Sequence, residues 1–135
     1  MPSTFNLSDF SVEQEAIALN QNTVFASATL TIYDGVQPAN ANTNLAGNNA
    51  LAIFTLPASG LNTVSPTGLI TFGPIANVSA IFTGAATFAR VTNGANTICD
   101  MSVGVGGGAD CIINSANIQS GATVSIASMT YQVTE

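Results

Sequence analysis

The chain has 135 residues, enough for one domain, and seven acidic residues against a single cation, Arg90, give it a net charge of −6. Because lysine and histidine are absent, the composition excludes an imidazole base, a Schiff-base amine and an imidazole metal ligand, and it argues against nucleic acid and anionic membranes as direct partners. We therefore expect a structural or binding protein with no enzymatic activity, no cofactor and no metal.

The N-terminal residues do not resemble a targeting segment. Although 47% of the residues are hydrophobic, no run of about 18 apolar residues occurs, so no membrane span is predicted. Acidic residues at Asp9, Glu13 and Glu15 stand where the apolar region of a signal peptide would be, and no positive charge precedes them. We expect neither a signal peptide nor a membrane span.

Residues 1–22 are predicted to form an N-terminal arm with one short helix. Ser11 is a suitable N-cap, Gln14 stands three positions later as in a capping box, and apolar residues follow at helical spacing. The helix is expected over 11–20. From Val24 onward the period changes to two, which places the start of a β domain at residue 23 and extends it to 135.

The first predicted strand, Thr29–Tyr33, alternates polar and apolar residues and stops at the turn dipeptide Asp34-Gly35. Val36–Asn49 follows as a long asparagine-rich loop without charge, a type of segment that often forms an interaction surface. Seven further strands are predicted at 50–56, 68–72, 78–82, 85–91, 97–103, 109–114 and 122–134.

The expected fold is mainly β, an antiparallel β-sandwich of jelly-roll-like type with one short N-terminal helix. In the last strand, the apolar parity of Val124 and Ile126 differs from that of Met129 and Tyr131, which predicts a β-bulge near Ser128.

Asn93-Gly94 predicts a tight hairpin, because a type I′ turn needs positive φ at both central residues. A loop of only these two residues would place Phe88 opposite Cys99 and Arg90 opposite Thr97.

On that register Arg90 would share a face with Phe88, Cys99 and Met101. A guanidinium in such surroundings must find a carboxylate or several carbonyl groups. The leading interpretation is a structural ion pair, and an intersubunit contact is compatible with it.

The two cysteines, Cys99 and Cys111, lie on either side of the glycine-rich segment Gly104–Gly108. A hairpin centred near Val105 would set them opposite or nearly opposite each other. Two interpretations stay open: a pair of buried thiols or a cross-strand disulfide.

The candidates for chemistry are few. Asp100 and Asp110 flank the glycine segment and could hold Ca²⁺, or they could accept turn N–H groups or pair with Arg90. The glycine segment precedes a strand pattern, and no lysine is present, so a phosphate loop is not expected. No base is available to activate a serine or cysteine, and Tyr33 with the seven phenylalanines fits core packing better than a sugar site.

Ala, Ser, Thr and Gly occupy strand positions where open β surfaces usually carry Lys and Glu, so strand edges are poorly protected against pairing. We expect the chain to form a homo-oligomer, with a trimer preferred, that docks on a larger shell.

The short N-terminal helix and three segments together resemble a known group of proteins: Leu30–Ala39 with the pattern Leu-x-Ile-Tyr-x-Gly-x-Gln-Pro, then Phe88–Val91, then Asp100–Gly104 with Gly108–Asp110. The chain resembles small virion-associated structural proteins of tailed bacteriophages over roughly residues 12–134. It departs from the group in its two cysteines and in the asparagine-rich loop, and no catalytic motif accompanies the resemblance.

The resemblance implies a capsid decoration or cement protein that stabilises the head by binding the outer capsid surface between capsomers. Such a protein would be made in the host cytoplasm and reside on the virion. Its partners would be the major capsid protein and copies of itself, with neither nucleic acid nor membrane. A phage tail or fibre component and a carbohydrate-binding β-sandwich adhesin are the alternatives.

Overall fold

A computed structural model of the chain describes residues 8, 14–16, 28–57, 62–106 and 108–132. These residues form a mainly β fold, as predicted, and Gln14–Ala16 are helical. The rest of the predicted helix and the predicted boundary at residues 22 and 23 lie outside the described residues. None of the described helices is long and apolar enough to cross a membrane.

Twelve strands lie in the described part of the chain. In chain order they are β1 (Thr29–Tyr33), β2 (Ala50–Thr55), β3 (Thr63–Val64), β4 (Leu69–Thr71), β5 (Val78–Ser79), β6 (Gly84–Ala85), β7 (Phe88–Asn93), β8 (Asn96–Gly104), β9 (Cys111–Ile113), β10 (Asn117–Ile118), β11 (Thr123–Val124) and β12 (Ile126–Gln132).

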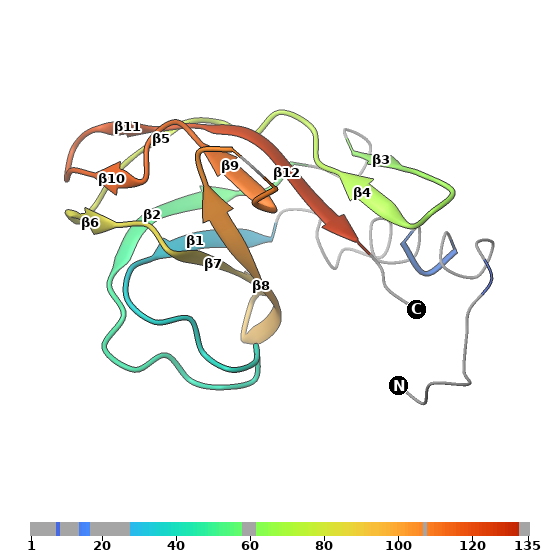
Figure 1. The fold of residues 1–135 in the computed structure, drawn as a ribbon, viewed down its shortest axis with the longest axis horizontal. Helices are drawn as coiled ribbons and strands as arrows, with labels where there is room; N and C mark the ends of the chain where they lie inside the picture. Colours follow the sequence, from blue (N-terminus) through green and yellow to red (C-terminus); the bar gives the residue numbers. More distant parts are fainter. Residues whose placement is uncertain (1–7, 9–13, 17–27, 58–61, 107, 133–135) are drawn as a thin grey trace.

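Eight of the strands form one sheet in the order β2-β1-β7-β8-β9-β12-β4-β3, and two short ladders pair β10 with β6 and β11 with β5. The sheet folds over on itself: β2, β1 and β7 make one layer, and β9, β12 and the β11–β5 ladder lie above it (Figure 1). Every neighbouring pair is antiparallel except β8 with β9.

The core lies between these layers and is filled by the inward-facing residues of the strands. Removing apolar side chains from water stabilises the fold by about 25 cal/mol per Å². The fully buried side chains include Leu30, Ile32, Phe54, Ile70, Val91, Val124 and Met129.

Two β-bulges change which side chains reach the core. In β2, Leu51 is the extra residue between the pairs Tyr33–Ala50 and Ile32–Ala52, so that Leu51 and Ala52 are both buried while Ile53 is exposed.

In β12 the extra residue is Ala127, between Ile126 and Ser128, and the next residue, Met129, is buried. The bulge predicted near Ser128 is confirmed.

The β7–β8 hairpin exists, but its predicted register is wrong. Its two-residue loop is Gly94-Ala95, since Asn93 pairs with Asn96, and Gly94 has φ of 62°. A bulge then shifts the register between Val91 and Thr92.

As a result Arg90 lies opposite Asp100, and Phe88 lies opposite Ser102. The loop lies one residue later than predicted, and the bulge shifts the register again, so that the pairing differs from the predicted one by an odd number of residues. An odd shift exchanges the two faces of a strand, so Arg90 lies on the face opposite to Cys99 and Met101.

The predicted hairpin between the cysteines is also wrong. β8 and β9 run parallel, with Val103 beside Cys111. The chain therefore runs in the same direction in the strands before and after the glycine-rich segment. Cys99 precedes Val103 by four residues, about 13 Å along a strand. That is beyond the roughly 7 Å Cα separation of a disulfide, and both thiols are free.

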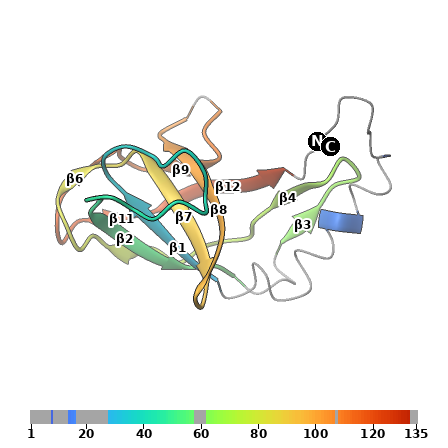
Figure 2. The ribbon, with the colours of Figure 1, turned by 90° about the horizontal axis from the view of Figure 1, so that it is seen from below.

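The loop between β1 and β2, residues 34–49, forms a further layer on the outer face of the sheet. It lies below β1 and β7 in Figure 1, and Figure 2, seen from below, shows it crossing in front of these strands and β8. The outward-facing Thr31, Phe88 and Arg90 are consequently buried although they point away from the core.

Candidate functional site

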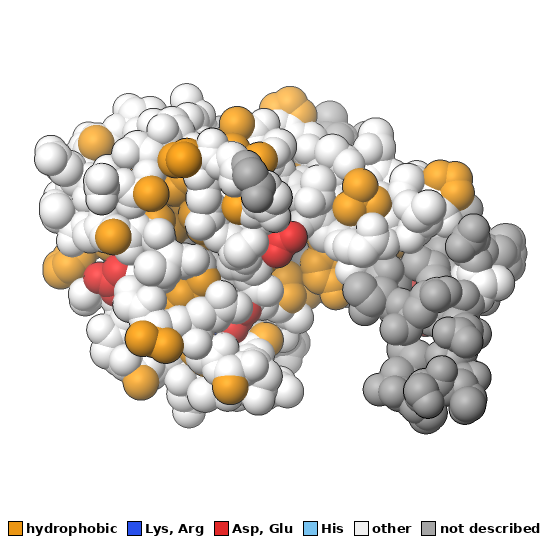
Figure 3. Space-filling model, in the orientation of Figure 1, with side chains coloured by type: hydrophobic (Ala, Val, Ile, Leu, Met, Phe, Trp, Pro, Cys, Tyr) orange, Lys and Arg blue, Asp and Glu red, His pale blue; other side chains and the backbone are white. Residues whose placement is uncertain are grey.

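The single cation of the chain is used inside the protein. Arg90 Nε donates to Asp100 Oδ1 at 2.6 Å and Nη2 donates to Oδ2 at 2.9 Å, and the two side chains are only 8% and 5% exposed. The hydrogen bonds that Arg90 donates to Asp100 raise the pKa of Arg90. The predicted structural ion pair is confirmed, and its guanidinium is not available to an outside anion. The face drawn in Figure 3 shows acidic and apolar side chains but no cationic one.

Tyr33 stacks on Phe88, with ring centroids 5.5 Å apart and an angle of 22° between the planes. Phe88 is fully buried, so this pair belongs to the covered outer face of the sheet. It does not offer the exposed aromatic surface that a sugar ring would need.

The other acidic candidate, Asp110, closes the loop before β9. Its Oδ2 accepts the backbone N–H and the hydroxyl of Ser102 at 3.3 and 3.2 Å, and Ser102 Oγ accepts the N–H of Asp110 at 2.9 Å. Asp110 therefore accepts a single backbone N–H, from Ser102 in β8 and not from the turn, while Asp100 pairs with Arg90. A Ca²⁺ ion between the two carboxylates would have to compete with the guanidinium. No group of three or more potential metal ligands occurs among the described residues.

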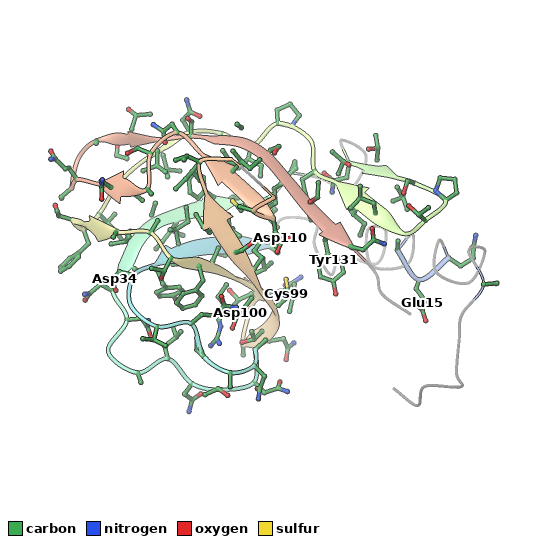
Figure 4. All side chains as sticks on the ribbon, viewed as in Figure 1. Glu15, Asp34, Cys99, Asp100, Asp110 and Tyr131 are labelled. Carbon is green, nitrogen blue, oxygen red and sulfur yellow. The ribbon has the colours of Figure 1, made fainter. Side chains whose placement is uncertain are left out.

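A cavity of about 200 Å³ lies between β8 and β12, lined by Cys99, Met101, Asp110 and Tyr131 among others. Figure 4 shows Cys99, Asp110 and Tyr131 around the space where the two strands diverge. Burial, with smaller contributions from Asp100 and Asp110, raises the pKa of Cys99 to about 12. The thiol is thus protonated at neutral pH and is not a nucleophile.

Cys111 is fully buried. Its burial, with a smaller contribution from the negative charge of Asp110, raises its pKa to about 12. Burial also raises the pKa of Tyr131. None of these groups has the lowered pKa of an activated nucleophile.

Asp34 lies at the other side of the molecule, at the end of β1, and joins the two ends of the loop 34–49. Its carboxylate accepts the backbone N–H of Asn49 at 2.6 Å and the Asn49 amide at 3.1 Å. These hydrogen bonds lower the pKa of Asp34, which is therefore ionised at neutral pH. Asn48 Nδ2 donates to the carbonyls of Asp34 and Val36 at 2.6 and 3.2 Å.

Three large hydrophobic side chains are exposed on the segments that meet at Asp34: Val36, two residues after it, and Ile81 and Phe82, just before Gly84, whose backbone lies beside the Asp34 carboxylate. We name the surface formed by Asp34, Val36, Ile81 and Phe82 the Asp34 face. Figure 3 shows apolar side chains beside the acidic one at the left, which is Asp34 as labelled in Figure 4. Leu51 links the elements of the face, because Ile81 N–H donates to the Leu51 carbonyl at 2.9 Å.

Gly84 also lies in this region. A Cβ at Gly84 would stand 3.0 Å from Leu51 Cδ2 and 3.2 Å from Asp34 Oδ2.

The Asp34 face was not predicted from the sequence. Ile81 and Phe82 fall in the predicted strand 78–82, but the strand β5 covers only Val78–Ser79. Two adjacent large apolar residues cannot both face the core of a regular strand, and this is the signal that could have indicated an exposed turn.

The chain matches no family model, no curated protein and no solved structure.

Proposed function

We propose that the chain is a structural protein of a bacteriophage virion, a decoration or cement protein that stabilises the head by binding the outer capsid surface between capsomers. The observation that carries the proposal is the Asp34 face, where large apolar side chains stand in water on a hydrogen-bonded frame. Exposed apolar groups of this size are typical of protein interaction surfaces. The resemblance to small virion-associated phage proteins supplies the kind of partner.

A role without catalysis agrees with the ionisable groups. The only guanidinium is buried in an ion pair, both thiols have a pKa of about 12, and the chain has no histidine or lysine. General acid–base and nucleophilic catalysis need groups that titrate near neutral pH or nucleophiles beside a base.

We also propose that copies of the chain associate into a homo-oligomer on the shell, with the trimer as the expected form. Outward strand positions such as Ser79, Ala85, Ala127 and Ser128 are exposed, small and without charge. Because these side chains are small and uncharged, neither steric bulk nor charge repulsion would prevent a neighbouring copy from approaching closely.

Electron cryo-microscopy of virions that encode the chain with a short tag tests the proposal. We expect tag density on the outer capsid between capsomers, in a fixed ratio to the major capsid protein. Density confined to the tail, in a few copies, would favour a tail or fibre component instead. Absence of the chain from purified virions would overturn a virion role altogether.

A further inference from the structure

We infer that the Asp34 face is the surface that contacts the shell, and that it fits a protein surface with an apolar recess beside a lysine or arginine. The inference rests on the proposed function and goes further, because it names the docking residues and the chemistry of their partner.

Val36 is held in place by its neighbours although its own side chain is 85% exposed. Thr87 Oγ1 donates to the Gly35 carbonyl at 2.8 Å, and Asn48 Nδ2 donates to the Val36 carbonyl at 3.2 Å. The backbone on both sides of the side chain is thus fixed before any partner arrives. Contact residues that are already ordered lose little entropy on binding, which favours affinity.

Ile81 and Phe82 are held in the same manner. Before them, Ala80 exchanges backbone hydrogen bonds of 2.8 Å with the segment Gly121-Ala122, and after them Thr83 Oγ1 accepts the N–H of Ser120 at 2.9 Å. The two side chains are 56% and 47% exposed on this anchored turn. Aromatic residues, phenylalanine among them, are enriched in protein interfaces relative to the rest of the surface.

Charge identifies the partner. Asp34 stands ionised among the apolar groups, and Arg90, the only Lys or Arg of the chain, is buried against Asp100. A second copy docking on this face, whether about a twofold axis or in the heterologous contact of a trimer, would bring no exposed lysine or arginine to neutralise Asp34. A shell protein that presents a lysine or arginine supplies the missing charge, so we assign the face to the shell rather than to another copy.

The test uses heads assembled without the protein and purified full-length variants, with binding measured by cosedimentation at several salt concentrations. Val36→Ser and Phe82→Ser change exposed side chains of the face. Val105→Ser is the matched control, because Val105 is an equally apolar, exposed residue in the loop between β8 and β9. A melting curve for each variant checks that the fold is intact.

We expect each variant of the face to weaken the apparent Kd at least about tenfold, a loss of about 1.4 kcal/mol, while Val105→Ser stays within about twofold of the wild type. Asp34→Asn, which keeps an oxygen to accept the Asn49 N–H, should weaken binding and reduce its salt dependence.

If the wild-type protein binds the heads and Val36→Ser and Phe82→Ser bind them equally well, the assignment of the face is overturned, but the proposed function is not. If the wild-type protein fails to bind the heads, both the assignment and the proposed function fall. Loss of self-association in the variants, seen as a lower mass by light scattering while head binding persists, would assign the face to a second copy and overturn the inference.

Discussion

Arg90 and Asp100 face each other across β7 and β8, and the guanidinium meets both carboxylate oxygens, at 2.6 and 2.9 Å. The loop 34–49 lies over this part of the outer sheet face, so a pair that would be exposed on an open sheet is buried. A buried pair contributes little net stability compared with apolar residues of the same shape, but it is costly to break on one side.

Replacing Arg90 by Ala should therefore lower the free energy of unfolding by about 3 to 5 kcal/mol, because it leaves the Asp100 carboxylate buried without its partner. Urea denaturation measures the change. The double variant Arg90→Met with Asp100→Leu is the control, and it should recover most of the lost stability. An Arg90→Ala protein as stable as the wild type would show that the ion pair is exposed to water in solution.

Both cysteines should be unreactive in the native protein at neutral pH. Their pKa values of about 12 keep the thiols protonated, and a thiol reagent needs the thiolate. Titration should find two thiols after denaturation and almost none before, and on slow native labelling the half-buried Cys99 should react before the buried Cys111. No thiol in the denatured, non-reduced protein would indicate a disulfide and contradict the parallel β8–β9 register.

Alkaline pH should destabilise the fold through the same groups. A pKa that is raised in the folded protein contributes stability that is fully present below the unfolded value, near 9 for a cysteine, and is lost as the pH rises toward about 12. Chemical denaturation across this range should show a decline that becomes shallower in Cys99→Ser, whereas an identical decline in the variant would argue against a buried, protonated Cys99.

Acid should act through Asp34. Its pKa is lowered below the ordinary 3.8 by the hydrogen bonds from Asn49, so the stability it contributes is present above that value and is lost as the pH falls through the folded pKa. The Asp34→Asn variant should be less stable than the wild type at neutral pH, and the difference should shrink at strongly acidic pH. Urea midpoints measured at both pH values give the comparison, and a difference independent of pH would exclude ionisation as its cause.

Gly35 allows the chain to enter the loop 34–49. Its φ is +78°, and a Cβ would lie 2.9 Å from Asn48 Nδ2, so Gly35→Ala should cost at least about 1 to 2 kcal/mol. Gly106→Ala is the matched control, because Gly106 has no positive φ and a Cβ there would meet no atom within 4 Å. Equal melting temperatures for the two variants would contradict the conformation given for Gly35.

The sequence predicted what depends on local pattern. The alternating strand Thr29–Tyr33 has the bounds of β1, and the change of apolar parity near Ser128 is the bulge in β12. It did not predict what depends on register. The Asn93-Gly94 dipeptide indicates a turn, but a loop one residue later and a bulge after Val91 decide which side chains meet.

The parallel pairing of β8 and β9 was missed for a related reason. A glycine-rich segment between two short strands usually indicates an antiparallel hairpin, since parallel neighbours usually need a longer crossover. Here hydrogen bonds between Asp110 and Ser102 close a short loop, which brings β9 beside β8 in the same direction. Side-chain hydrogen bonds of this kind have no periodic signature in a sequence.

The position of β12 in the sheet affects how the protein folds during its synthesis. This last strand lies between β9 and β4, so Tyr131 pairs with Ile70 from the middle of the chain. Until β12 leaves the ribosome, β4 and β9 have no strand between them and the sheet is in two parts. Such long-range pairing slows folding, and the sheet cannot be completed until every strand from β1 to β12 has been synthesised.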